Sequence, residues 1–193
     1  MLTESDDDVN VRLSGRLRWR LAAMVMATQF LHGASVARAS VVLPLSLAEL
    51  TEAAAIVVDG TVDEVRTALG PDGVERQVLV RVASAWKGQP EAHVYVRLAG
   101  GRLGRIETRV PGVPIVGVGD RVVWFLTAHP QGGYAVIGLH QGALRTIAAP
   151  DGEPRVLAPS KARVARGDVR RAPRRVSDLA SEVRALVSAR GAR

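Results

Sequence analysis

The side chains that most often bind metals or attack substrates are few in this chain of 193 residues. It has no cysteine, and its four histidines lie in separate segments without the spacing of metal ligands: His32, His93, His129 and His140. A chain without cysteine has no disulfides, no thiolate zinc site and no cysteine nucleophile. We therefore predict that it holds no metal and no other cofactor.

Three carboxylates, Asp59, Asp63 and Glu64, come closest to an acid–base pair. Such a pair needs two carboxyl groups of different proton affinity, whereas the alternating pattern here places Asp59 and Asp63 on the solvated side of a strand. No serine, histidine and aspartate are arranged around a nucleophile elbow. Gly117-Val118-Gly119 leads into a strand and lacks the helix that a phosphate loop needs. We predict that the chain is not an enzyme.

His93, Tyr95 and Arg97 alternate with apolar residues and therefore share one face of a predicted strand. His93 and Arg97 can form hydrogen bonds, and the Tyr95 ring between them can stack on a ligand. Such a combination suits the binding of a polar polymer, which barrel faces often bind. We interpret this trio as a candidate surface-binding face. An ordinary exposed face with cross-strand pairing is the alternative. The chain has few aromatic residues for stacking on bases, so nucleic acid is not an expected partner.

The elements that must position this face are predicted to be mostly strands. Ser46 and Glu49 form a capping box, which predicts a short helix. Short segments of alternating apolar and polar residues follow, separated by glycine and proline. Gly60 within the first segment predicts a bulge or a sharp bend. Residues 122–126 are apolar on both faces, which predicts a central strand with Trp124 buried. The predicted fold class is mainly β, a small antiparallel OB-like barrel over residues 40–159.

The C-terminal part of the chain carries its net charge of +7, with ten basic and three acidic residues in 160–193. We predict a basic linker over residues 160–175 and a C-terminal helix over residues 176–193. The alternative to a polyanion-binding linker is a solvated one whose charge only prevents aggregation. The residues predicted to contact a polyanion are Lys161, Arg163, Arg166, Arg170, Arg171, Arg174 and Arg175.

Residues 1–39 have the organisation of a secretory signal peptide. Four arginines precede an apolar run over residues 21–36, and the run is followed by Ala37-Arg38-Ala39. Small residues at Ala37 and Ala39 fit the pockets of signal peptidase, so we predict cleavage before Ser40 and export to the periplasm or the medium. An uncleaved anchor is the alternative, but a span needs about 20 apolar residues. Acidic residues ahead of the arginines depart from the signal-peptide pattern.

A family resemblance extends over about residues 45 to 147. The capped helix, the sequence Ala-Ala-Ala-Ile-Val-Val-Asp-Gly-Thr-Val and a long strand ending at Trp86-Lys87-Gly88 resemble the opening of netrin-like and metalloproteinase-inhibitor-like domains. The continuation through Pro111-Gly112-Val113-Pro114, Gly119-Asp120 and residues 138–142 looks like exported bacterial proteins. The resemblance implies an OB-type barrel. It does not extend to zinc chelation by an N-terminal cysteine, since the predicted first residue is Ser40.

Two functions are compatible with these observations. The first is an exported, non-catalytic binding or structural module of the bacterial envelope, whose basic tail contacts an anionic polymer or lipid. The second is an inhibitor or accessory domain that acts on an extracytoplasmic enzyme through the loops of the barrel. Strong salt sensitivity that depends on the tail would favour the first function, and stoichiometric binding to one protein would favour the second.

Overall fold

The computed structural model describes residues 44–156 and 173–191, all of which belong to the compact unit Val42–Arg193. The predicted signal peptide therefore lies outside the described residues, together with the predicted cleavage residues Ala37, Ala39 and Ser40. The same is true of most of the basic residues predicted to contact a polyanion: Lys161, Arg163, Arg166, Arg170 and Arg171.

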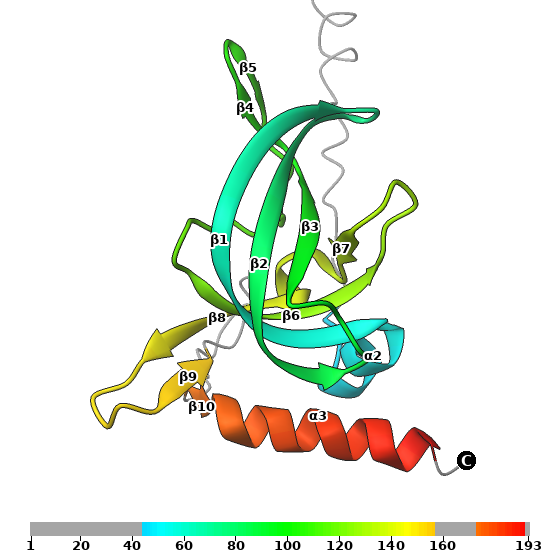
Figure 1. Ribbon diagram of the computed structural model, residues 1–193, viewed down its shortest axis with the longest axis vertical. Coiled ribbons are helices and arrows are strands. Elements are labelled where there is room, and N and C mark those ends of the chain that lie inside the picture. The colour runs from blue at the N-terminus through cyan, green and yellow to red at the C-terminus, as the bar shows by residue number, and fades with distance from the viewer. Residues whose placement is uncertain (1–43, 157–172, 192–193) are drawn as a thin grey trace, which may run out of the picture. The chain divides into compact units, whose positions relative to one another are not determined.

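Strands account for most of the regular structure (Figure 1), and a short helix and a longer one lie at the two ends of the described chain. In chain order the elements are α2 (Leu47–Ala53), β1 (Ile56–Gly70), β2 (Gly73–Lys87), β3 (His93–Ala99), β4 (Gly101–Leu103), β5 (Ile106–Thr108), β6 (Arg121–Ala128), β7 (Tyr134–Val136), the 3-10 helix η1 (Leu139–Gly142), β8 (Ala143–Ala148), β9 (Pro154–Val156), β10 (Arg174–Arg175) and α3 (Val176–Gly191).

The main sheet curls until its first strand meets β6. Its strands follow the order β1-β2-β3-β7-β6, and β6 also pairs with β1, which makes the sheet partly closed and barrel-like. These pairs are antiparallel except β3 with β7, which is parallel. From β6 the sheet continues through β8, β9 and β10. The predicted mainly β fold with a short N-terminal and a C-terminal helix is confirmed.

The long strands β1 and β2 bend sharply to achieve this closure. Their register shifts between Val57 and Val58, between Asp59 and Gly60, and between Val62 and Glu64. At Gly60 a Cβ atom would lie 2.6 Å from Val80 Cγ1 and 2.8 Å from the Arg81 carbonyl oxygen. Such separations are far below van der Waals contact, so only glycine fits at this approach. The predicted irregularity at Gly60 is confirmed.

Two hydrophobic cores lie on opposite faces of β6. The barrel core fills the interior of the sheet and includes Val80, Val96 and Trp124. The helix-side core lies between the outer face of the sheet and the two helices, and includes Phe125 and Val183. Residues 122–126 alternate between these cores and are all fully buried. Burial on both faces explains why this segment lacks alternating polarity, and the predicted central strand is confirmed.

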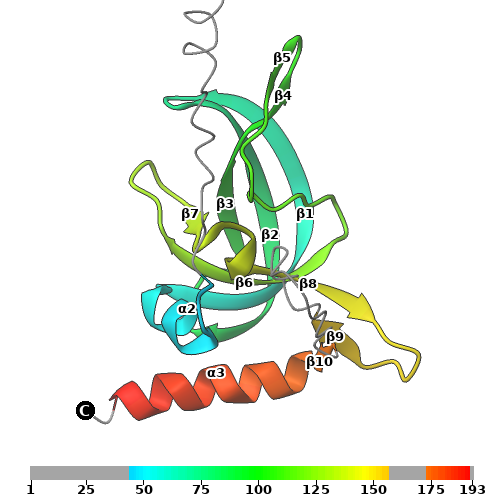
Figure 2. The same ribbon diagram turned by 180° about the vertical axis from the view of Figure 1, so that it is seen from behind.

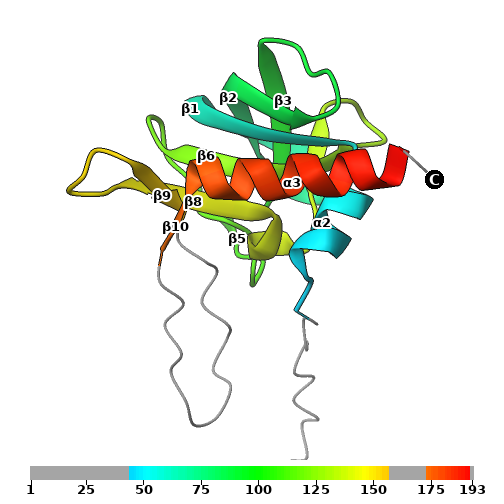
Figure 3. The ribbon, with the colours of Figure 1, turned by 90° about the horizontal axis from the view of Figure 1, so that it is seen from below.

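Both helices cover the outer face of the sheet. At the start of α2, Ser46 Oγ accepts from the Glu49 amide and the Glu49 carboxylate accepts from the Ser46 amide, as the capping box predicted. At the end of α2, the carbonyl oxygens of Thr51 and Glu52 accept from Nζ of Lys87, the last residue of β2, at 2.6 Å and 3.2 Å. Figure 3 shows α3 lying across the sheet beside α2, and α3 buries Leu179 and Val183 in the helix-side core.

The structure corrects two expectations and adds a third difference from simple alternation. Asp59 was expected on a solvated face, but the helix-side core lies on that face and Asp59 is buried. Strict alternation along β2 would turn Trp86 inward with Val80, but the register shifts place it in the helix-side core. The basic linker was expected to continue to Arg175. Instead Arg174 and Arg175 form β10, where Arg174 pairs with Val156.

Truncation of the buried tryptophan tests the central-strand assignment. Trp124 is fully buried in the barrel core, so Trp124→Ala should lower the free energy of unfolding by about 3–5 kcal/mol through lost contacts and a cavity. Chemical denaturation measures the loss. Trp124→Phe is the matched control, because the indole Nε1 has no hydrogen-bond partner among the described residues, and it should cost clearly less. A loss below about 1 kcal/mol for the alanine variant would contradict the assignment.

Candidate functional site

The three residues of the candidate surface-binding face lie together on the outer side of β3. Val94, Val96 and Leu98 point into the barrel core, so His93, Tyr95 and Arg97 face outward between them. On β2 their cross-strand partners are Arg81, Leu79 and Gln77. We call the outer surface of β1, β2 and β3 that includes the trio the polar face.

A bulge in β1 adds two consecutive acidic residues to the polar face. Val62 pairs with Val80 and Val65 with Val78, both pairs facing inward, whereas only Leu79 lies opposite Asp63 and Glu64. The extra residue lets both carboxylates lie on the outer side. Asp63 accepts from Arg81 Nε at 3.1 and 3.2 Å, and His93 Nε2 lies 3.5 Å from Asp63 Oδ2. His93 therefore lies beside the cross-strand ion pair of Arg81 and Asp63.

Arg97 joins the sheet to the turn that connects β6 and β7. Its Nη1 donates to Glu75 Oε1 at 2.6 Å, while Nε and Nη2 donate to the carbonyl oxygens of Gly132 at 3.0 Å and Gln131 at 3.1 Å. Each of the three guanidinium nitrogens therefore has an acceptor within the protein, so the side chain is held in one position. Arg97 acts as a positioning residue for the turn.

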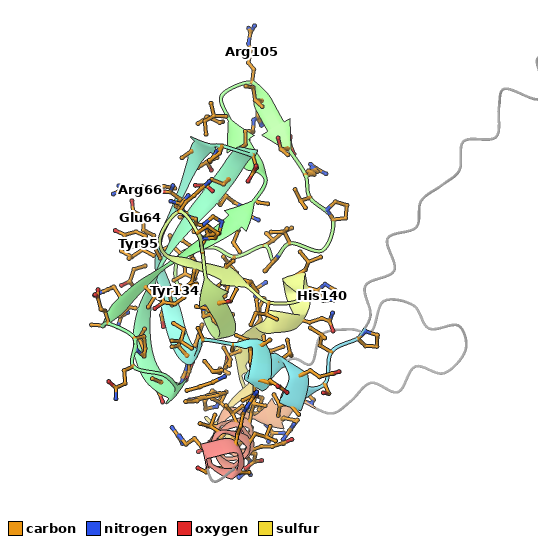
Figure 4. All side chains as sticks on the ribbon, turned by 90° about the vertical axis from the view of Figure 1, so that its right-hand side faces the viewer. Glu64, Arg66, Tyr95, Arg105, Tyr134 and His140 are labelled. Carbon is orange, nitrogen blue, oxygen red and sulfur yellow. The ribbon has the colours of Figure 1, made fainter. Side chains whose placement is uncertain are left out.

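Tyr95 is open to solvent, with 57% of its surface exposed, and His93 on the same strand is exposed as well. Figure 4 shows it on the same side of the molecule as Glu64 and Arg66, which form an ion pair with each other. The Glu64 carboxylate raises the pKa of the Arg66 guanidinium. The turn reaches Tyr95 directly, since a Cβ on Gly133 would lie 2.8 Å from the Tyr95 carbonyl oxygen.

Two shallow clefts flank Arg97. The smaller, of about 150 Å³, is lined by residues of the polar face and the turn: Gln77, Tyr95, Arg97, Gly132 and Gly133. The larger, of about 240 Å³, lies beyond Arg97 and includes Glu75, Leu98, His129 and Leu139. Both are below the 300–1,000 Å³ of typical small-molecule pockets.

The carboxylate expected to be solvated at position 59 is one half of a buried ion pair. Asp59 is 2% exposed, and its two oxygens accept from Arg121 Nε at 2.9 Å and Nη2 at 2.6 Å. This bidentate bond raises the pKa of the Arg121 guanidinium. Asp59 and Asp63 thus each have a guanidinium partner, and neither is placed with a free carboxyl group for acid–base chemistry. The sequence offered no signal for Arg121, which lies 62 residues away.

The three histidines of the described residues lie on separate elements. His93 is on β3, His129 is in the turn and His140 is in η1, which Figure 4 places on the opposite side of the molecule from Tyr95. Within residues 44–156 and 173–191, no group of three histidine or carboxylate residues is arranged to hold a metal ion. In the same part of the chain, no helix is long and apolar enough to cross a membrane.

No family model matches the chain, and no curated protein matches it significantly.

Disruption of the buried ion pair should cost more than disruption of the exposed one. Arg121→Met leaves the Asp59 carboxylate buried without its partner, and we expect the free energy of unfolding to fall by about 2–3 kcal/mol, given that Arg121 itself is partly exposed. Arg81→Met, which removes the exposed partner of Asp63, is the matched control and should cost less than about 1 kcal/mol.

Adding Asp59→Asn to Arg121→Met removes the unpaired charge, so it should recover part of the lost stability. Denaturant titration of the three variants measures all of these effects. Equal losses for Arg121→Met and Arg81→Met would contradict a special role for the buried pair.

Proposed function

We propose that this chain is an exported, non-catalytic binding module of the bacterial envelope, with the polar face as its ligand surface and the basic segment as a second contact for anionic material. The observation that carries the proposal is the exposed Tyr95 ring, which lines the smaller cleft on a face fixed by ion pairs and by the Arg97 contacts to the turn. Preorganised aromatic and hydrogen-bonding groups bind polymers at a low entropic cost.

The position of the polar face on the barrel supports this proposal. The corresponding strands and adjoining loops of OB-type barrels bind oligosaccharides and oligonucleotides. Here the turn between β6 and β7 adjoins Tyr95, and Asp72 and Gly73 of the turn between β1 and β2 line the larger cleft. A polar polymer that follows this surface would contact the tyrosine ring and both turns.

The attachment of the basic segment supports its role as a second contact. Val156, which precedes the segment, pairs with Arg174 near the end of the segment, in β9 and β10. Of the basic residues in this segment, Arg174 donates to Glu182 on α3, whereas Arg175 has no ion-pair partner among the described residues. We propose that the remaining arginines and Lys161 are available to phosphate or carboxylate groups.

Export can be tested independently of binding. If residues 1–39 are a signal peptide, protein recovered from the extracytoplasmic fraction should begin at Ser40, and intact-mass measurement should show the loss of 1–39. Ala39→Arg should block cleavage, because signal peptidase accepts only small side chains at that position. A chain that keeps its N-terminus and sediments with the membrane would indicate an anchor instead.

Loss of the exposed aromatic ring should weaken polymer binding. With soluble peptidoglycan fragments as the probe, Tyr95→Ala should reduce the affinity of the full chain about tenfold, as expected for the loss of one stacking contact. Ile147→Ala is the matched control, because Ile147 is an exposed apolar strand residue on β8. Titration calorimetry measures both variants.

The two proposed contacts should differ in salt dependence. Replacement of Lys161, Arg163, Arg166, Arg170 and Arg171 by serine should abolish the part of the affinity that falls with rising salt. The Tyr95→Ala effect should persist at high salt. Unchanged affinity in both variants would contradict the proposal.

A further inference from the structure

The hairpin of β4 and β5 stands apart from the rest of the fold. It forms a separate two-stranded sheet with only three residues in each strand. Figures 1 and 2 show it projecting beyond the end of the barrel, and Figure 4 shows Arg105 at its outermost point. The polar face does not include this hairpin, so a role for the hairpin is independent of the polymer binding proposed for that face.

The base of the hairpin is fixed to the barrel. Arg76 donates to the carbonyl oxygens of Gly100 at 3.2 Å and Pro114 at 2.9 Å, which lie before and after the hairpin in the chain. The Gly100 amide donates to the Val74 carbonyl oxygen at 2.8 Å. A Cβ on Gly101 would lie 3.0–3.1 Å from side-chain atoms of Arg76 and Thr67, so the strand approaches the sheet closely. The tip is therefore held out in a defined position.

Two aliphatic side chains occupy the same side of the hairpin at its tip. Leu103 and Ile106 are direct cross-strand partners, and such partners point to the same face of an antiparallel pair. They are 37% and 57% exposed. Neither belongs to the barrel core or the helix-side core. Their apolar character thus contributes to neither core.

The hairpin carries more arginine than carboxylate. Arg102 lies opposite Glu107 across the hairpin, but Glu107 forms its ion pair with Arg109, at 2.7 Å. Neither Arg102 nor Arg105 forms an ion pair among the described residues, and Arg102 makes a long contact, 3.4 Å, to the Gly104 carbonyl oxygen. The tip therefore combines two exposed aliphatic side chains with two guanidinium groups that have no ion-pair partner in the described part of the chain.

We propose that the β4–β5 tip inserts into the interface of an anionic lipid membrane. In this arrangement Leu103 and Ile106 enter the boundary of the acyl chains, while Arg102 and Arg105 bind lipid phosphates. An anionic polymer in water would satisfy the guanidinium groups but leave the aliphatic pair hydrated. A lipid interface satisfies both kinds of side chain at the depth that each requires.

The lack of cysteine in the chain gives a direct test. The variant Ile106→Cys of the full chain has one cysteine, which is labelled with an environment-sensitive dye. The variant Ile147→Cys on β8, labelled in the same way, is the matched control. Each protein is mixed with phosphatidylcholine vesicles, with or without phosphatidylglycerol. We expect the dye at position 106 to shift to the blue and brighten several-fold with the anionic vesicles, and the dye at position 147 to stay unchanged.

Further variants distinguish insertion by the tip from adsorption through other parts of the chain. Arg102→Ser with Arg105→Ser should abolish the response at position 106, whereas serine at Lys161, Arg163, Arg166, Arg170 and Arg171 should leave the dye response of bound protein in place. A bound protein without a response at position 106, or with equal responses at 106 and 147, would overturn the proposal. A response to envelope protein but not to lipid would also overturn it.

Discussion

The shared strand β1 is the constraint on which the rest of the structure depends. Its first half pairs with β2 on one side and with β6 on the other, from Ile56 to Thr61, and this double pairing closes the sheet. β1 can pair with both β2 and β6 because it bends. At the bend, Gly60 lies close to the Val80 side chain and the Arg81 carbonyl oxygen. Asp59, next to this glycine, binds Arg121 at the start of β6 and so connects the two closing strands at the bend.

Closure determines where apolar surface must be covered. A curled sheet buries its inner face in its own interior, which the barrel core fills, but the strands that close it are also apolar on their outer side. The helices α2 and α3 cover that outer side, although about 120 residues separate them in the chain. A narrow apolar stripe on α3 cannot hold an isolated helix in water. Its burial against Phe125 and Trp86 makes the C-terminal helix part of the fold.

The sequence was a good guide wherever one local rule determined the outcome. The capping box, the glycine at the bend and the alternation of His93, Tyr95 and Arg97 each reflect short-range geometry, and each appears in the structure. The positions of Asp59 and Trp86 depended instead on the register between distant strands and on a helix at the other end of the chain. After a bulge, each later residue of the strand lies on the opposite face from the one that simple alternation predicts. The position of the bulge cannot be predicted from the alternating pattern alone.

Charge separates the surfaces of the protein into two kinds. On the polar face the cations have carboxylate partners: Arg66 pairs with Glu64, Arg81 with Asp63, and Arg97 with Glu75. The polymer binding proposed for this face would come from the tyrosine ring, the smaller cleft and hydrogen bonds, and should change little with salt. The hairpin tip and the basic segment have guanidinium groups in excess of carboxylates, so the contacts with anionic material that we propose for them should weaken as salt rises. The two proposed kinds of binding would use separate surfaces of one chain and respond differently to ionic strength.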